Sequence, residues 1–175
     1  MGNSPHTSRL SRRKALAVGG AGLLAMSLPA WAQQAQRIKW ADLIPEGVPY
    51  GEIIATGEYD GVKDIWIPEF DDNGLQLNSA LDGKMITLAG YVIPLEVSSE
   101  GTTSFVLVPF IGACIHVPPP PPNQLVFVTT DTPWPSDKLW EAVLVTGQLS
   151  ANIRRTDVAQ VGYDLTATQI EKFQR

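Results

Sequence analysis

Five short segments with the residue pattern of β-strands follow one another toward the C-terminus, and they constrain the fold more than any other feature of this sequence. The first two span residues 85–93 and 103–108, and the others read NQLVFVTT, EAVLVTGQLS and VGYDLTA. Two of the segments carry an internal glycine, Gly90 and Gly147, and such glycines often mark bends that let a sheet close on itself. We therefore expect a mainly all-β fold, a small five-stranded OB-like Greek-key barrel over residues 80–175, with a β-sandwich as the alternative.

The segments that flank these strands have different patterns. Residues 33–79 are rich in prolines, glycines and acidic residues, which predicts an irregular N-terminal arm. Within the arm, the pair Asp71-Asp72 could form a carboxylate site but is more typical of a solvated turn. The C-terminal segment TATQIEKFQR predicts a short helix that Thr168 can cap.

Residues 1–32 have the pattern of an export signal. A basic start with the letters SRRK precedes an apolar stretch over residues 15–28, and the small residues that follow favour cleavage after Ala32. The paired arginines indicate the twin-arginine route, with a Sec signal or an uncleaved anchor as the alternatives. The stretch is shorter than the ~20 residues of a membrane span, and no cysteine lies near the cleavage site to carry a lipid. We therefore expect a periplasmic protein without stable membrane insertion after cleavage.

Cleavage would leave a strongly acidic domain. The leader contains four of the 13 basic residues and none of the 18 acidic ones, so the mature chain keeps nine basic residues against 18 acidic ones, a net charge of −9. A surface with this charge repels nucleic acid and anionic lipid, and it favours cations or basic partners. The composition therefore argues against a nucleic-acid-binding function.

The segment GACIHVPPPPPNQL contains the single cysteine of the chain, Cys114, and one of its two histidines, His116. The other histidine, His6, lies in the expected leader. Because Val117 precedes a proline, its backbone favours the extended region, and alternate side chains of an extended segment point to the same side. Cys114 and His116 should therefore lie on one face.

The residues after this pair predict a stiff continuation of the loop. Successive prolines favour a polyproline rod, which holds a loop open at low entropic cost. The rod ends at Asn123 and Gln124, whose side-chain amides could steady a neighbouring group. The prolines of the run are Pro118, Pro119, Pro120, Pro121 and Pro122. The run and the two amides are therefore the candidate supporting residues of any site at the Cys-x-His pair.

A thiolate beside an imidazole is a candidate metal site. Zn²⁺ binds cysteine sulfur and histidine nitrogen, and Cu(I) also favours thiolate. Because Cys114 and His116 alone do not complete a closed site, further ligands are expected from Glu96, Glu100 or Met85, or from the same segment of a second chain. In the last case, two Cys-x-His pairs would form a Cys₂His₂ site in a homodimer.

Four other interpretations remain open for the same residues. Cys114 could be a small buried hydrophobic residue beside a hydrogen-bonded His116. It could be a nucleophile that His116 activates and that Asn123 or Gln124 orients. It could form a mixed disulfide with a partner, whereas an internal disulfide is excluded because the chain has one cysteine. The proline rod could instead dock onto an aromatic groove of a partner protein.

Three segments together resemble an uncharacterised bacterial family, domain of unknown function 3299: LDGKMITLAGYVIPLE, FVLVPFIGACIHVPPPPPNQLVFV and EAVLVTGQL. The similarity extends from about Trp40 to the C-terminus, and its most specific part runs from Cys114 and His116 through the prolines to Asn123 and Gln124. The resemblance implies an exported or lipid-anchored periplasmic protein, with some members encoded beside ABC-transporter components in zinc-responsive gene clusters. It implies an accessory role in metal supply, but no established catalytic or ligand residue.

These observations together lead us to expect a non-enzymatic periplasmic accessory protein. It would bind zinc or copper through Cys114 and His116 and act with an envelope or ABC-transport system. A protein-interaction module of an envelope transport complex, docking through the proline loop, is the alternative. A thiol-dependent enzyme is the third hypothesis.

Overall fold

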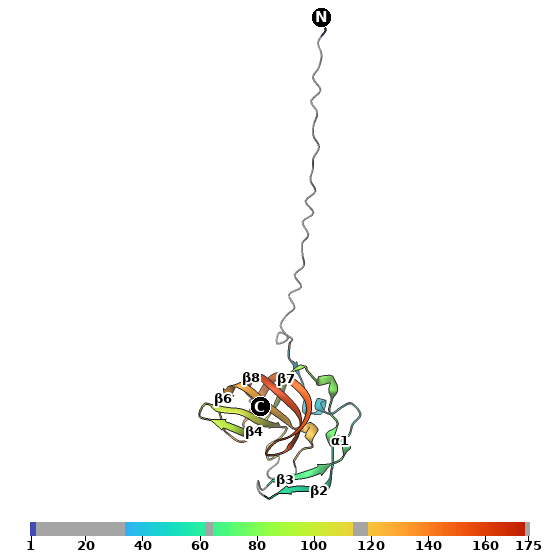
Figure 1. The fold of residues 1–175 in the computed structure, drawn as a ribbon, viewed down its shortest axis with the longest axis vertical. Helices are drawn as coiled ribbons and strands as arrows, with labels where there is room; N and C mark the ends of the chain where they lie inside the picture. Colours follow the sequence, from blue (N-terminus) through green and yellow to red (C-terminus); the bar gives the residue numbers. More distant parts are fainter. Residues whose placement is uncertain (3–33, 62–64, 114–118, 174–175) are drawn as a thin grey trace.

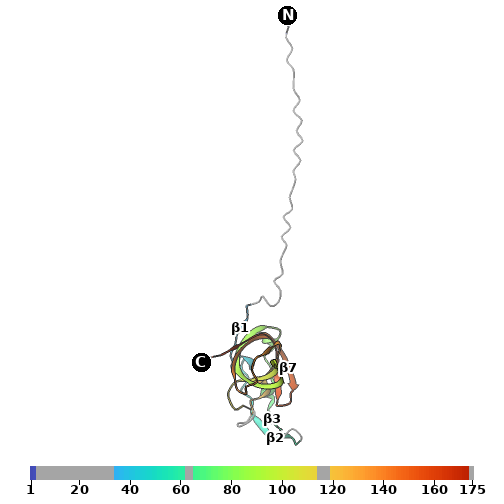
Figure 2. The same cartoon turned by 90° about the vertical axis from the view of Figure 1, so that its left-hand side faces the viewer.

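The strands of the molecule form a small barrel, around which the remaining elements are arranged (Figures 1 and 2). The computed structural model describes residues 1–2, 34–61, 65–113 and 119–173. No helix within these ranges is both long enough and apolar enough to cross a membrane. The barrel strands are β4 (Met85–Ser98), β5 (Gly101–Val108), β6 (Val126–Trp134), β7 (Ala142–Arg155) and β8 (Gln160–Lys172), and the short helix η4 (Pro122–Gln124) precedes β6. All five strand segments predicted from the sequence are therefore confirmed.

The barrel closes because its first and fourth strands pair. In the order β4–β5–β6–β8–β7 each strand is hydrogen-bonded to the next, and β7 also pairs with β4, with Leu88 opposite Val145. Neighbouring strands are antiparallel except β6 and β8, which run parallel with Val126 opposite Tyr163. This connectivity is that of a five-stranded Greek-key barrel of the OB type, so the predicted fold class is confirmed.

The two glycines that predicted bends have different structural roles. Gly147 lies at a register shift between β7 and β8, where a Cβ would meet the backbone of Thr166. Gly90 lies beneath the indole of Trp40, where a Cβ would be 2.9 Å from the ring. Gly147 therefore permits a bulge, whereas Gly90 makes room for a packed aromatic side chain.

The predicted C-terminal helix is wrong. β8 runs through most of that segment, and Ile170 lies in its antiparallel ladder with β7. The spacing of Ile170 and Phe173 suggested a helical face, but pairing with β7 satisfies the backbone N–H and C=O groups along β8 and decides the structure. Instead of capping a helix, Thr168 donates its hydroxyl to the carbonyl of Thr146.

Residues 34–79 contain more regular structure than the irregular arm predicted from the sequence. The elements are β1 (Gln36–Arg37), η2 (Trp40–Leu43), β2 (Ile53–Asp60), β3 (Ile65–Phe70), α1 (Asp72–Leu75) and η3 (Ser79–Leu81). β1 runs parallel to β4, whereas β2 and β3 form a hairpin that pairs with no other described strand. Register shifts between Ile53 and Glu58 interrupt the strand pattern, which is why the sequence concealed this hairpin.

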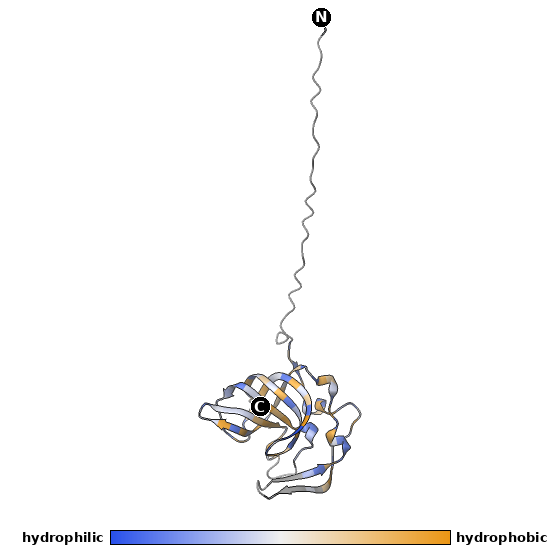
Figure 3. Cartoon of the chain, in the orientation of Figure 1, coloured by the Kyte–Doolittle hydropathy of each residue, from blue (hydrophilic) through white to orange (hydrophobic). Residues whose placement is uncertain are grey.

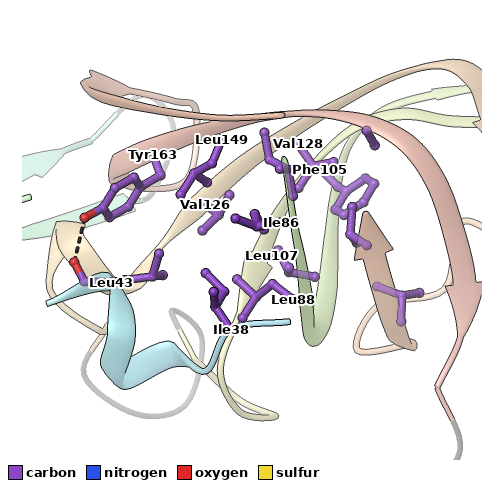
Figure 4. Packing of buried hydrophobic residues seen from close by; sticks show 14 of the residues in the cluster. Ile38, Leu43, Ile86, Leu88, Phe105, Leu107, Val126, Val128, Leu149 and Tyr163 are labelled. Carbon is purple, nitrogen blue, oxygen red and sulfur yellow. Dashed lines mark hydrogen bonds between the residues drawn. The ribbon is translucent and has the colours of Figure 1, made fainter. Parts of the chain in front are cut away.

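Two hydrophobic clusters lie on the two faces of the barrel sheet. The inner cluster fills the barrel and includes Leu88, Leu107 and Val126 (Figure 4). The outer cluster includes Val106 and Leu125. Because successive residues of a strand point to opposite faces, the same strands supply both clusters, and Figure 3 shows hydrophobic and hydrophilic residues alternating along the barrel strands.

Tyr163 is the largest of the fully buried side chains, and its hydroxyl links the N-terminal segments to the barrel through two hydrogen bonds. Its hydroxyl donates to the carbonyl of Leu43 at 2.6 Å (Figure 4) and accepts from the N–H of Asn78 at 2.6 Å. Burial raises the pKa of Tyr163 to about 12, although the bond from Asn78 opposes this shift. The phenol therefore stays neutral and hydrogen-bonded inside the barrel at ordinary pH.

Candidate functional site

The described residues on both sides of the Cys-x-His segment are packed against the protein. Cys114 and His116 themselves lie outside the described residues, so their shared face stays a prediction. Ala113, immediately before them, is fully buried in the outer cluster. Beyond residue 118, Pro119 is half-buried and Pro120 is buried. The described residues that flank the segment are therefore at least partly buried on both sides.

The described part of the proline run packs against the protein. Pro120, Pro121 and Pro122 are buried, and Pro118 lies outside the described residues. The packing depends on a glycine, because a Cβ at Gly74 would be 3.0 Å from the Cβ of Pro121. The prolines were predicted to form a stiff rod that holds a loop open, and the described ones, Pro120, Pro121 and Pro122, are buried against the protein.

The amides of Asn123 and Gln124 bind backbone segments from the N-terminal part of the chain. Asn123 Nδ2 donates to the carbonyls of Asn73, at 2.8 Å, and Gln76, at 3.1 Å. Gln124 Nε2 donates to the carbonyl of Trp40 at 2.9 Å. Asn123 Oδ1 is buried and has no hydrogen-bond partner among the described residues. The two amides therefore tie the end of the proline run to α1 and η2.

The additional ligands suggested by the sequence are dispersed over the barrel. Met85 begins β4, Glu96 lies near its end, and Glu100 lies in the turn that leads to β5. Glu100 immediately precedes the first residue of β5, whereas Ala113, the last described residue before Cys114, follows the last residue of β5. The carboxylate of Glu96 accepts a hydrogen bond from Ser104 at 3.0 Å. Within the described ranges, no three His, Cys, Asp or Glu side chains group together as a metal site would require.

Asp71 confirms the turn interpretation of the Asp-Asp pair. Its carboxylate caps α1 and accepts hydrogen bonds from the N–H groups of Glu52 and Gly74 and from the side chain of Asn73. Desolvation raises the pKa of Asp71, but these hydrogen bonds outweigh it and hold the pKa below its ordinary value. Asp71 is therefore an ionised structural cap.

A groove on the outer face of the barrel was not anticipated from the sequence. It lies between strands β4, β5 and β6 and the C-terminal end of β7, is open to solvent, and has a volume of about 420 Å³. Its walls include Glu96, Ser104, Phe127 and Arg154. These residues belong to four strands, so no local motif marks the groove. The adjacent basic residues Arg154 and Arg155 are its visible sign in a sequence that is acidic overall.

The closed barrel defines a small all-β protein of the OB type. A family model described as a protein of unknown function, DUF3299, matches residues 40–172, and the chain belongs to this family. It is similar to the crystal structure of a DUF3299 family protein from Pseudomonas aeruginosa PAO1, with 30% sequence identity and a TM-score of 0.65, over 81% of this chain and 98% of that chain. No protein among the curated sequences matched the chain. The family resemblance predicted from the sequence is confirmed.

Proposed function

We propose that this protein is a non-enzymatic periplasmic accessory that binds a zinc or copper ion through Cys114 and His116. The observation that carries the proposal is the burial of the residues that flank the segment containing both side chains. Ala113 on one side belongs to the outer cluster and Pro120 on the other side is buried, so the described residues that flank the thiol and the imidazole are packed against the protein. A rigid scaffold on both sides favours a defined ligand geometry.

The number of ligands favours an open or a shared site. Each mature chain supplies one cysteine and one histidine, and the described residues contain no further group of metal-binding side chains. A closed structural zinc site has four protein ligands. Two chains could therefore share one ion as a Cys₂His₂ site, or each chain could hold an exchangeable ion for transfer to an envelope or ABC-transport partner.

Export supports a delivery role. The leader has the paired arginines of a twin-arginine signal, a route that carries folded proteins, so metal could be loaded before the protein crosses the membrane. Periplasmic fractionation and N-terminal sequencing test this part of the proposal. The expected result is a periplasmic protein that begins at Gln33, and a cytoplasmic protein with an intact leader would contradict it.

Elemental analysis tests the metal site. The mature protein, purified from the periplasm without chelators, should contain one zinc or copper per one or two chains. Cys114→Ser should remove the metal, whereas Ser99→Ala, in the exposed β4–β5 turn, should retain it. A ratio of one ion per two chains, with a dimer that dissociates when the ion is removed, would assign the shared site. Stoichiometric metal in Cys114→Ser, or none in the wild-type protein, would reject the proposal.

A protein-interaction module is the second candidate function, but the structure favours a different surface from the proline loop. Pro120, Pro121 and Pro122 are buried, so they offer no docking strip. By contrast, Ile53 and Ile54 of β2 are 38% and 62% exposed, in a hairpin region rich in acidic residues. Under this alternative, Ile54→Glu should abolish capture of a transport partner, and the equally drastic Leu139→Glu should not.

A further inference from the structure

Four charged side chains line the outer groove, namely Glu96, Arg154, Arg155 and Asp157. Two of them, Arg154 and Glu96, are each held in place by a neighbour. Arg154 lies at the end of β7 with its guanidinium carbon 4.2 Å from the centre of the Phe127 ring. Its Nη1 is also 3.4 Å from Oδ1 of Asp164, and the other carboxylate oxygen of Asp164 accepts from Asn152 at 2.7 Å. The ring and the carboxylate fix the plane of the guanidinium, which leaves other N–H donors for a ligand.

The negatively charged side chain of Glu96 is held in place by a hydrogen bond from the buried hydroxyl of Ser104. Ser104 is 3% exposed, and its Oγ donates to Oε2 of Glu96 at 3.0 Å. Glu96 itself is exposed, so its carboxylate is oriented from below and open to the groove. Groups that are already oriented bind a ligand at a lower entropic cost than freely rotating ones.

From this geometry we infer that the groove binds a small zwitterion, an α-amino acid or a short peptide, whose carboxylate pairs with Arg154 and whose ammonium group pairs with Glu96. A guanidinium binds a carboxylate through paired hydrogen bonds, and a carboxylate accepts from an ammonium group. The groove volume of about 420 Å³ is within the range of small-molecule sites, roughly 300–1,000 Å³.

The arrangement of charges selects a zwitterion over simpler ions. A simple anion would approach Arg154 but would also meet Glu96 and Asp164 on an acidic protein. A simple cation would approach Glu96 but would meet the guanidinium of Arg154. Only a ligand with both charges is attracted at both ends, so the groove penalises each single-charge ligand.

The position of the groove agrees with this role. In OB-type barrels, ligands bind across the second and third strands, beside the loops that follow the first and fourth. The corresponding strands here are β5 and β6, which supply Ser104 and Phe127, and the end of β7 supplies Arg154. This likeness concerns the place on the fold, whereas the chemical class of the ligand follows from the side chains.

Dialanine and its two blocked forms test the inference directly. N-acetyl-dialanine keeps only the carboxylate, and dialanine amide keeps only the ammonium group. In an NMR titration of the ¹⁵N-labelled protein, dialanine should shift the amides of the groove, and each blocked form should bind about tenfold or more weakly, because each loses one charged hydrogen-bonded pair. The titration is made in a Cys114→Ser background, so its result is independent of the proposed metal site.

Two variants then assign the two ends of the ligand. Arg154→Gln should weaken binding of dialanine about tenfold but leave dialanine amide unchanged. Glu96→Gln should weaken dialanine by a similar factor but leave N-acetyl-dialanine unchanged. Arg37→Gln on β1 and Glu100→Gln in the β4–β5 turn make the same charge changes outside the groove and should leave all affinities unaltered.

Several outcomes would overturn the inference. These are no shift with dialanine at millimolar concentration, equal binding of dialanine and its blocked forms, or shifts that lie away from the groove. Tighter binding of a neutral oligosaccharide or of a single-stranded oligonucleotide would also overturn it, since these lack the paired charges. Crossed loss of affinity in the two variants would support it, because a merely structural role would weaken all three ligands together.

Discussion

The two faces of the same barrel strands differ in what they do. Across β4, β5 and β6, Val92, Leu107 and Val126 lie side by side in the inner cluster, and all are fully or almost fully buried. The neighbouring residues along the same strands point to the outer face. There, Val106 and Phe127 lie opposite each other in an apolar row. The outer row continues into a charged groove, whereas the inner row continues into a sealed core.

This difference shows how a small barrel separates stability from binding. The inner face excludes water, so its residues are replaceable only by others of similar size and polarity. The outer face is partly open, so it can carry Glu96 and Arg154 at little cost to the fold. We therefore expect substitutions to have large effects inside the barrel and small effects in the groove.

The test with the largest expected effect replaces one leucine by alanine on each of the two faces. Leu107 is fully buried in the inner cluster, and Leu95 is half-buried beside the groove. Leu107→Ala should lower the free energy of unfolding by about 3–5 kcal/mol, because it removes buried methyl groups and leaves a cavity. Leu95→Ala should lower it by about 1 kcal/mol. Urea unfolding measures both, and equal losses would show that the two faces contribute alike.

A second test concerns the support of the Cys-x-His loop. Asn123→Ala should lower the free energy of unfolding by about 2–3 kcal/mol, because it leaves the carbonyls of Asn73 and Gln76 without their donor. Gln148→Ala removes an exposed amide with one hydrogen bond and should change stability little. The comparison uses urea unfolding, and a near-neutral Asn123→Ala would show that the loop support is not part of the stable core.

The third test uses the phenol inside the barrel. Tyr163→Phe should cost about 1–2 kcal/mol near neutral pH, because Leu43 O and Asn78 N–H lose their partner. The pKa of Tyr163 is raised from 10.0 to about 12 in the folded protein, so the folded state keeps a proton that the unfolded state loses. The stabilisation that arises from this pKa difference is fully present below pH 10 and is lost as the pH rises toward 12.

The pH dependence can be isolated by comparison with the variant. The stability difference between the wild-type protein and Tyr163→Phe should shrink between pH 10 and pH 12, measured by urea unfolding at each pH. Other groups that titrate in this range affect both proteins equally. A constant difference would mean that Tyr163 ionises as readily in the folded protein as in the unfolded one.

The smallest effect is expected in the groove. Glu96→Gln removes a charge from an exposed carboxylate and should change the free energy of unfolding by less than about 0.5 kcal/mol. The same variant should weaken zwitterion binding strongly. Glu96→Gln would therefore affect binding more than stability, whereas Leu107→Ala would affect stability more than binding. A large loss of stability would show that the bond between Ser104 and Glu96 has a structural role.

Sequence patterns were sufficient to locate the five barrel strands, but not to give the full length of β8 or the elements around the barrel. Residues 85–93 and 103–108 predicted strands because their β-branched and aromatic residues follow a local pattern, and β4 and β5 confirm them. The end of β8 was mistaken for a helix, since local spacing around Ile170 does not reveal a partner strand. The hairpin of β2 and β3 was missed because bulges interrupt its alternation.

The candidate site was likewise predicted only in part from the sequence. The sequence identified Cys114, His116, Asn123 and Gln124 because rare residue types stand beside a proline run. It did not show that the two amides bind backbone carbonyls or that the described prolines are buried, since both depend on segments far along the chain. It also suggested Glu100 as a ligand, and this residue lies in the β4–β5 turn, where its role as a ligand stays a prediction.

The sequence by itself determined the all-β class, the five barrel strands and the chemical groups available to a site, because these depend on residue type and short-range spacing. Only the tertiary structure decided which residues meet. The pairing of β4 with β7 closes the barrel, and the extension of β7 brings Arg154 onto Phe127. Such contacts join residues that are distant in sequence, and their free energy comes from strand pairing and burial that no short segment can specify.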